Sequence, residues 1–352
     1  MQRLTRIVAH IKTQHNSNGY RCLQNEIQAM MNIGLIGCGM WGRNLARNLV
    51  QLEVLASVAD QHAKNAAEFG SAFAAKQVDV DTLIHDQSID GIVIATAAPS
   101  HDALAIAALS AGKHVYVEKP LSLTLAGAKA IQDAAHSAKK QVMVGHLIRY
   151  HAAFIELQEQ LAVGAIGNLR HVQANRLAMG RIRNTESVLF DLCPHDLSLI
   201  LALIGNLPTK IHCAGASHMT PNIVDFLTSF MGFENGVSAG MQTSWLSPFK
   251  EHRLTVTGSG GSLVFDDTKP WQEKLTLFQD QMQLNSEHFI INRANPIALP
   301  VHEAEPLKDE MRAFIQTCET GKAAPTDIAE AIMVQQVLET MQTQLIDTSA
   351  AS

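Results

Sequence analysis

Three residues of this chain have the types and the surroundings that proton transfer requires: Lys119, Asp191 and His195. Lys119 follows the apolar run 115–117, and ligands of an open parallel sheet bind beyond the carboxyl ends of its strands, so the ammonium should face a crevice. Asp191 and His195 lie four residues apart, and an imidazole titrates near neutral pH. Together they could oxidise an alcohol, with His195 as base, Lys119 stabilising the developing alkoxide and Asp191 orienting the hydroxyl or the imidazole.

Each of these residues also has an alternative interpretation. Most lysines are solvated surface charges, so Lys119 alone would be uninformative. Asp191 precedes the apolar pattern of residues 197–204 and could cap a helix N-terminus there. The roles of Lys119 and His195 could also be exchanged, although a lysine accepts a proton only after a large fall in its pKa.

A glycine-rich loop lies upstream, after a strand expected at residues 32–36. Gly37 permits a tight turn, Gly39 lets backbone amides approach a pyrophosphate, and Gly42 allows close helix packing. A second expected strand ends at Asp60, close to the ~20-residue spacing of a carboxylate that binds the adenosine ribose. The combination predicts a dinucleotide site that prefers NAD, because this carboxylate would repel the 2′-phosphate of NADP. A turn after the strand is the alternative role of Asp60.

Strand and helix continue to alternate after Asp60, which indicates an α/β domain with a doubly wound parallel sheet of the Rossmann type. This domain is expected to end near Tyr150. From Leu169 onward, runs of alternating apolar and polar residues indicate a second α/β domain with an open, mixed, largely antiparallel sheet. The predicted organisation is a leader at 1–30, a Rossmann NAD-binding domain at 31–150, a substrate-binding domain at 151–305 and C-terminal helices at 306–352 that pack back on the Rossmann domain.

The leader at residues 1–30 has four basic residues and a single acid, Glu26. Such a segment could be a transit peptide or an upstream extension before a start at Met30 or Met31. We expect it to lie outside the core fold, because the first strand pattern begins at Asn32 and needs no earlier residue.

The composition restricts the classes of partner. A formal net charge of -6 and a pI near 6.2 disfavour nucleic acid, and a lack of apolar stretches of ~20 residues disfavours a membrane span. Five scattered cysteines disfavour disulfides or zinc and favour a reducing cytoplasm. A metal site of His146, His151 and His195 is disfavoured, because no ligand pair at helical spacing accompanies them.

The chain resembles the Gfo/Idh/MocA family of pyridine-nucleotide sugar oxidoreductases between about Asn32 and Leu345. The landmarks are the glycine loop, the stretch 95–101, the tripeptide 118–120 and Asp191 followed by His195. The resemblance implies a sugar bound between the open sheet and the nicotinamide, with Lys119, Asp191 and His195 as the catalytic group. The implied NAD-binding residues are Gly37, Gly39, Met40, Trp41, Gly42, Asp60, Thr96, His101, Glu118 and Lys119. The chain departs from the family pattern at Ala97, where a proline is usual, and at Ala313, where many members have histidine.

Two segments, 145–151 and 175–183, resemble family members that oxidise UDP-linked amino sugars at C3. Arg181 and Arg183 could bind the diphosphate in pairs of hydrogen bonds, or belong to a solvated basic loop. Arg149 and His151 could bind substrate, or form structural hydrogen bonds at the domain junction.

The resemblance thus implies a UDP-N-acetylglucosamine 3-dehydrogenase, as in polysaccharide or lipid A biosynthesis, with a separate aminotransferase as a possible pathway partner. The alternatives are a dehydrogenase of the corresponding uronic acid, or one of a free sugar or inositol. A nucleotide-sensing binding protein without turnover is the alternative outside enzymes. We also expect a homo-oligomer formed through the open sheet.

Overall fold

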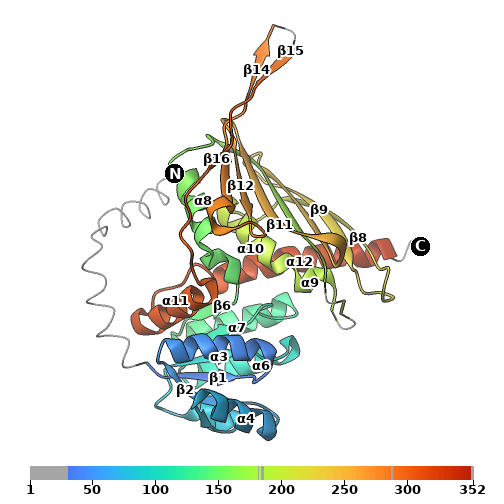
Figure 1. Ribbon diagram of the computed structural model, residues 1–352. Helices are drawn as coiled ribbons and strands as arrows, with labels where there is room; N and C mark the ends of the chain where they lie inside the picture. Colours follow the sequence, from blue (N-terminus) through green and yellow to red (C-terminus); the bar gives the residue numbers. More distant parts are fainter. Residues whose placement is uncertain (1–30, 181, 184–185, 287, 350–352) are drawn as a thin grey trace, which may run out of the picture.

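The computed structural model describes residues 31–349, except for residues 181, 184–185 and 287. The leader at 1–30 and Arg181 therefore lie outside the described residues. Figure 1 shows two sheets at opposite ends of the molecule. Two C-terminal helices, α11 (Pro306–Thr320) and α12 (Ile328–Ser349), lie between them.

The first sheet has six parallel strands in the order β3-β2-β1-β4-β5-β6, which confirms the predicted Rossmann type. Its strands are β1 (Ile33–Ile36), β2 (Leu55–Ala59), β3 (Lys76–Gln77), β4 (Gly91–Ile94), β5 (His114–Val117) and β6 (Val142–Val144). All residues of β1, β4 and β5 are buried, as expected for strands that helices cover on both faces.

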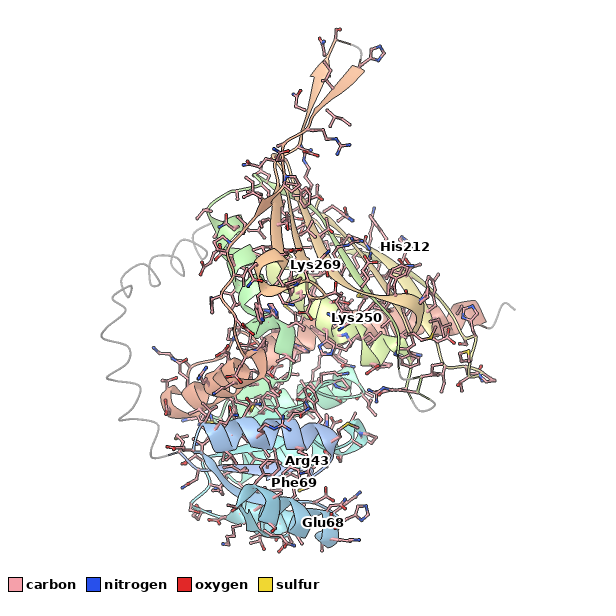
Figure 2. The ribbon with its side chains drawn as sticks, in the orientation of Figure 1. Arg43, Glu68, Phe69, His212, Lys250 and Lys269 are labelled. Atoms are coloured by element: carbon pink, nitrogen blue, oxygen red, sulfur yellow. The ribbon has the colours of Figure 1, made fainter. Side chains whose placement is uncertain are left out.

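The helices that pack on this sheet are α3 (Met40–Gln51), α4 (Ala63–Phe73), α5 (Val80–His85), α6 (His101–Ser110) and α7 (Leu125–Ala138). Arg43 of α3 lies over the ring of Phe69 of α4, 5.3 Å from its centroid (Figure 2). The strand order reverses between β1 and β4, and in such sheets the crevice beyond these two strands holds the ligand. The glycine loop connects β1 to α3 at this crevice.

The second sheet has eight strands in the order β16-β13-β12-β11-β7-β10-β9-β8. Its strands are β7 (Leu169–Met179), β8 (Lys210–Ala216), β9 (Phe226–Gly232), β10 (Ser238–Ser244), β11 (Leu246–Gly258), β12 (Ser262–Asp266), β13 (Leu275–Phe278) and β16 (Ile297–Ala298). The pair β7 and β10 is parallel and the other neighbours are antiparallel, which confirms the predicted mixed, largely antiparallel sheet.

Helices cover one face of this second sheet. They are α8 (Ala152–Ala162), which contacts β12, α10 (Cys193–Ile204), which contacts β7 and β10, and α12, which contacts β8. The other face carries exposed side chains such as His212 of β8 (Figure 2). A hairpin of β14 (Gln281–Asn285) and β15 (His288–Asn292) projects from the end of the sheet (Figure 1).

The two C-terminal helices connect the sheets. Helix α11 packs on α3 and β5, whereas α12 packs on α7 and β6 at one end and on α10 and β8 at the other. Of the helices that the structure describes, none has the length and apolar character needed to cross a membrane.

Candidate active site

Lys119 and Asp191 come together from the two domains. Lys119 follows β5, and Asp191 is the last residue of the short helix α9 (Val188–Asp191). Lys119 Nζ donates a hydrogen bond to the backbone oxygen of Asp191 at 2.7 Å and to its Oδ1 at 3.3 Å. The two side chains are 19% and 12% exposed, so this ion pair is only partly solvated. The predicted lysine is therefore no free surface charge.

Asp191 has two further donors. Trp245 Nε1 donates to its Oδ2 at 3.2 Å, and Arg183 Nη2 donates to its Oδ1 at 2.9 Å. The alternative role of Asp191 as a helix cap is not what the structure shows, because α10 begins at Cys193 with Leu192 at its N-cap position. The carboxylate instead holds Lys119 and Arg183 at one point.

His195 lies in the first turn of α10, four residues after Asp191. Its Nδ1 is enclosed and has no hydrogen-bond partner among the described residues. Burial lowers the pKa of His195 well below its usual value, and the nearby positive charges of Lys119 and Arg176 lower it further. The ring is therefore neutral at physiological pH and can accept a proton.

A pocket of about 130 Å³ opens beside Asp191, between the second sheet and α9. Its lining residues are Arg176, Leu177, Ala178, Gly180, Arg183, Asp191, Leu192, Ser244, Trp245 and His252. Arg176 donates to Asp196 through Nε at 3.0 Å and through Nη2 at 2.7 Å. Burial lowers the pKa of His252 to about 4, with a further contribution from the Arg176 charge.

Arg176, Trp245 and His252 line the pocket but are not among the predicted site residues, although Arg176 lies in the segment 175–183. Arg176 could have been found from the sequence, because it follows Val172 and Ala174 at alternate positions of β7, which face the core. A charged residue at such a position needs a buried partner. Trp245 and His252 had no comparable local signal, since their place depends on how β10 and β11 align with β7.

The glycine loop has the geometry that a pyrophosphate cradle requires. Gly37 has a φ of 107°, a left-handed conformation that favours glycine, and a Cβ on Gly42 would lie 2.0 Å from the Gly37 oxygen. Asp60 accepts from the backbone amide of Cys38 in this loop at 2.8 Å and from that of His62 at 2.8 Å. Asp60 thus both forms a turn and lies against the loop, so its two interpretations are compatible.

Other residues of the predicted cofactor site lie around this loop. The indole of Trp41 donates to Glu118 Oε1, and Met40 is largely exposed at the start of α3. His101 is buried, with Nδ1 2.8 Å from the Pro120 oxygen and Nε2 3.1 Å from the Thr96 oxygen. His101 therefore lies between the loop at Thr96 and the loop at Pro120.

Arg149 and His151 have partners within the protein. Arg149 Nη1 lies 3.7 Å from Glu330 Oε1 on α12, and its guanidinium lies over Phe154. His151 Nδ1 accepts from the Ala153 amide at the start of α8, and its ring stacks on Trp271. These contacts are those of the domain-junction interpretation, and the structure does not bring either residue to the pocket.

Arg183 is the described member of the predicted arginine pair. Its side chain is 42% exposed and its Nη1 lies 2.7 Å from Glu186 Oε1. The structure therefore brings Lys119 and Arg183 together at Asp191, and Asp191 and Arg183 line the pocket. His195 follows Asp191 by four residues, in the first turn of α10.

The first sheet is of the Rossmann type and carries a glycine loop shaped for a pyrophosphate. Acid and base side chains lie between it and the second sheet. These two features define a dinucleotide-dependent oxidoreductase. Comparison with known proteins agrees. Residues 31–146 match the family model described as oxidoreductase family, NAD-binding Rossmann fold, and residues 154–264 match the GFO/IDH/MocA C-terminal domain. The chain belongs to the Gfo/Idh/MocA family, which confirms the resemblance, and it is a dehydrogenase that binds NAD.

The names of the relatives indicate more than one kind of substrate. A UDP-N-acetylglucosamine 3-dehydrogenase of Acidithiobacillus ferrooxidans is 32% identical over 216 residues, which are 61% of this chain and 67% of that protein. An inositol 2-dehydrogenase of Acidothermus cellulolyticus is 28% identical over 68% of this chain and 74% of that protein. A solved structure of the Acidithiobacillus ferrooxidans enzyme has a TM-score of 0.79 at 25% identity, covering 90% of this chain and 97% of that one.

Proposed function

We propose that this protein oxidises the C3 hydroxyl of UDP-N-acetylglucosamine, with NAD as hydride acceptor. The observation that carries the chemistry is the contact of Lys119 with Asp191, which lines the pocket. The charge of Lys119 also acts on the buried, neutral imidazole of His195. The similarity to the Acidithiobacillus ferrooxidans enzyme and the position of Arg183 support the choice of substrate.

In this mechanism, NAD when bound supplies the acceptor for the hydride that leaves the sugar carbon. The loop of Gly37 and Gly42, with Asp60 for the adenosine ribose, would hold it. His195 takes the hydroxyl proton as the carbonyl forms. Lys119 stabilises the developing alkoxide, and the Asp191 carboxylate keeps the ammonium in place.

The charges of the described pocket residues favour a neutral sugar over its uronic acid. Arg176 is paired with Asp196, and Arg183 is paired with Asp191 and Glu186. Because the lowered pKa leaves His252 neutral, the described lining residues other than Arg183 offer no unpaired cation to a sugar carboxylate, and this proposal assigns Arg183 to the diphosphate. An N-acetylhexosamine has no carboxylate, so it needs no unpaired cation in the pocket.

The diphosphate belongs at the exposed side of the pocket in this proposal. Of the two described arginines that line the pocket, Arg183 is the more exposed. A guanidinium can bind two phosphate oxygens at once. A phosphate would replace Glu186 at Nη1, while Nη2 keeps its bond to Asp191.

The product would be a 3-keto sugar nucleotide, which an aminotransferase could aminate for polysaccharide or lipid A biosynthesis. We place the reaction in a reducing cytoplasm, since the four described cysteines are free thiols. A homo-oligomer through the uncovered face of the second sheet stays a prediction, and light scattering of the purified protein would test it.

The test of this function compares NADH formation with UDP-N-acetylglucosamine, its uronic acid, free N-acetylglucosamine and inositol. A coupled aminotransferase draws an unfavourable oxidation forward. Preference for the nucleotide-linked neutral sugar supports the proposal. Preference for the uronic acid, or turnover of inositol or free sugars alone, would assign the chain to the corresponding alternative, which the inositol 2-dehydrogenase relatives represent. Binding without any turnover would instead indicate a nucleotide sensor.

A further inference from the structure

Two carboxylic acids share one phenol beneath the glycine loop. Tyr116 Oη lies 2.9 Å from Glu118 Oε1 and 3.0 Å from Glu310 Oε2, and all three side chains are buried. Tyr116 and Glu118 belong to β5 and its end, whereas Glu310 belongs to α11, 194 positions from Tyr116. The C-terminal helix therefore reaches the cofactor domain through this phenol.

The phenol cannot satisfy two ionised acids. It carries one proton, so Tyr116 donates to one carboxyl group and can only accept from the other. An ionised carboxylate is purely an acceptor, and two such charges around one buried hydroxyl repel each other. One of the two acids, Glu118 or Glu310, is therefore protonated.

The number of hydrogen-bond donors around each acid identifies which of the two is protonated. Glu118 accepts from Tyr116, from the Trp41 indole and, at 3.2 Å, from the Lys119 amide. Among the described residues, Glu310 has only Tyr116 as a partner, and its Oε1 is buried without one. Burial raises the pKa of both acids, but the hydrogen bonds from Trp41 and Tyr116 partly offset this at Glu118. At Glu310 the Glu118 charge adds to burial, and the pKa is raised well above its usual value. The proton therefore belongs to Glu310.

The surroundings hold this arrangement tightly. A Cβ on Gly145 would lie 2.6 Å from Tyr116 Oη and 2.9 Å from Glu118 Oε2, so the backbone packs directly against both groups. The ring of Tyr116 also meets that of Phe314 of α11, edge to face at 5.9 Å. These contacts confine the Tyr116 hydroxyl group to its positions beside Glu118 and Glu310.

We infer that Glu310 is a positioning residue for the dinucleotide: as a neutral acid it donates to Tyr116, which commits the phenol proton to Glu118. Consecutive hydrogen bonds strengthen one another, so the bond from Glu310 reinforces the one that Glu118 receives. Glu118 then stays ionised and fixes the indole of Trp41, which lies in the first turn of α3, directly after the glycine loop. Glu310 acts through these residues and does not touch the cofactor itself.

Infrared spectroscopy tests the proton directly. The difference spectrum between the parent protein and Glu310→Gln at neutral pH should contain the carbonyl stretch of a protonated carboxylic acid, lost in the variant. A difference that shows only carboxylate bands would overturn the inference, because Glu310 would then be ionised. This measurement needs neither cofactor nor sugar, so its outcome is independent of the proposed substrate.

NADH titration followed by fluorescence tests the positioning role. Glu310→Leu removes the donor to Tyr116 and should weaken NADH binding on the order of fivefold. Glu310→Gln should restore it, because an amide can donate to the same oxygen. Tyr116→Phe breaks the chain, so it should weaken binding and make a further Glu310→Leu change ineffective.

Unchanged affinity in both Glu310→Leu and Tyr116→Phe would contradict the positioning role, as would a Gln variant as weak as the Leu variant. If Glu310→Leu does not fold, Tyr116→Phe and the infrared comparison still decide the question. Thermal unfolding of each variant separates loss of fold from loss of affinity.

Discussion

Lys119 Nζ lies 2.7 Å from the backbone oxygen of Asp191, a contact between residues 72 positions apart in the chain. Lys119 belongs to the cofactor domain, and Asp191 belongs to the helix layer of the second sheet. The contact therefore lies where the two domains meet, and it places the candidate alkoxide-stabilising group beside the pocket that Asp191 lines.

Replacing Lys119 by alanine should reduce turnover by a factor on the order of a hundred or more, because charge stabilisation at the developing alkoxide is lost. NADH affinity, measured by fluorescence, should change little. Lys129→Ala, at an exposed position of α7, is the matched control and should retain parent turnover. Equal turnover in the two variants would place Lys119 outside the reaction.

The lowered pKa of His195 predicts an unusual acid limb of the pH profile. A free imidazole near pH 6.5 would make kcat/KM fall below that pH, whereas His195 should stay neutral and active to lower pH. A limb near pH 6.5 that disappears in His195→Asn would contradict the neutral imidazole.

The lowered pKa of His195 also makes the stability of the fold depend on pH. Because the pKa of His195 is lower in the folded state, the unfolded chain binds the proton more readily, so the free energy of unfolding falls as pH drops below 6.5. Above pH 6.5 the contribution is fully present. His195→Gln, which cannot titrate, should lose less stability between pH 7 and pH 5 than the parent, as measured by denaturant unfolding. An identical loss in both proteins would argue against the shift.

Asp60 should determine the choice between NAD and NADP. Its carboxylate would accept the ribose diol and repel a 2′-phosphate, so the parent should prefer NAD and Asp60→Ser should narrow that preference. The comparison is kcat/KM with each cofactor, with Asp133→Ser on the exposed side of α7 as control. Equal efficiency with both cofactors in the parent protein would remove Asp60 from this role.

Removing Arg183 should weaken binding of a UDP-sugar by ~1–3 kcal/mol, the range of a charge-assisted hydrogen bond. UDP alone should lose affinity similarly, because the proposed contact is with the diphosphate. Calorimetry of Arg183→Ala against Arg170→Ala, an exposed arginine of β7, measures the difference. If only inositol or free sugar binding changes, Arg183 contacts the sugar ring instead. We expect the same weakening for Arg181→Ala.

Local patterns were enough to predict much of the fold. The glycine loop follows directly from the spacing of Gly37, Gly39 and Gly42 after a strand, and strand alternation indicated the second sheet. These signals act between neighbours in sequence, so they can be interpreted without the tertiary structure.

The pocket and the junction depend on distant partners and were less accessible. Arg149 lies near Glu330 on α12, and His146 Nδ1 lies 2.8 Å from the same carboxylate, 184 positions away. The sequence around Arg149 contains no sign of that partner, so its substrate-binding and structural interpretations could not be separated. Trp245, directly after β10, likewise contacts Asp191 from 54 positions away in the chain.

The most direct test of the proposed reaction uses UDP-N-acetylglucosamine carrying deuterium at C3. Deuterium should appear in the reduced nicotinamide, and the product should be a 3-keto sugar by mass spectrometry. Turnover should be slower than with unlabelled substrate if hydride transfer limits the rate. Reduced nicotinamide without deuterium would show that the hydride comes from another carbon. Failure to reduce NAD with this substrate, while inositol is oxidised, would contradict the proposed function itself.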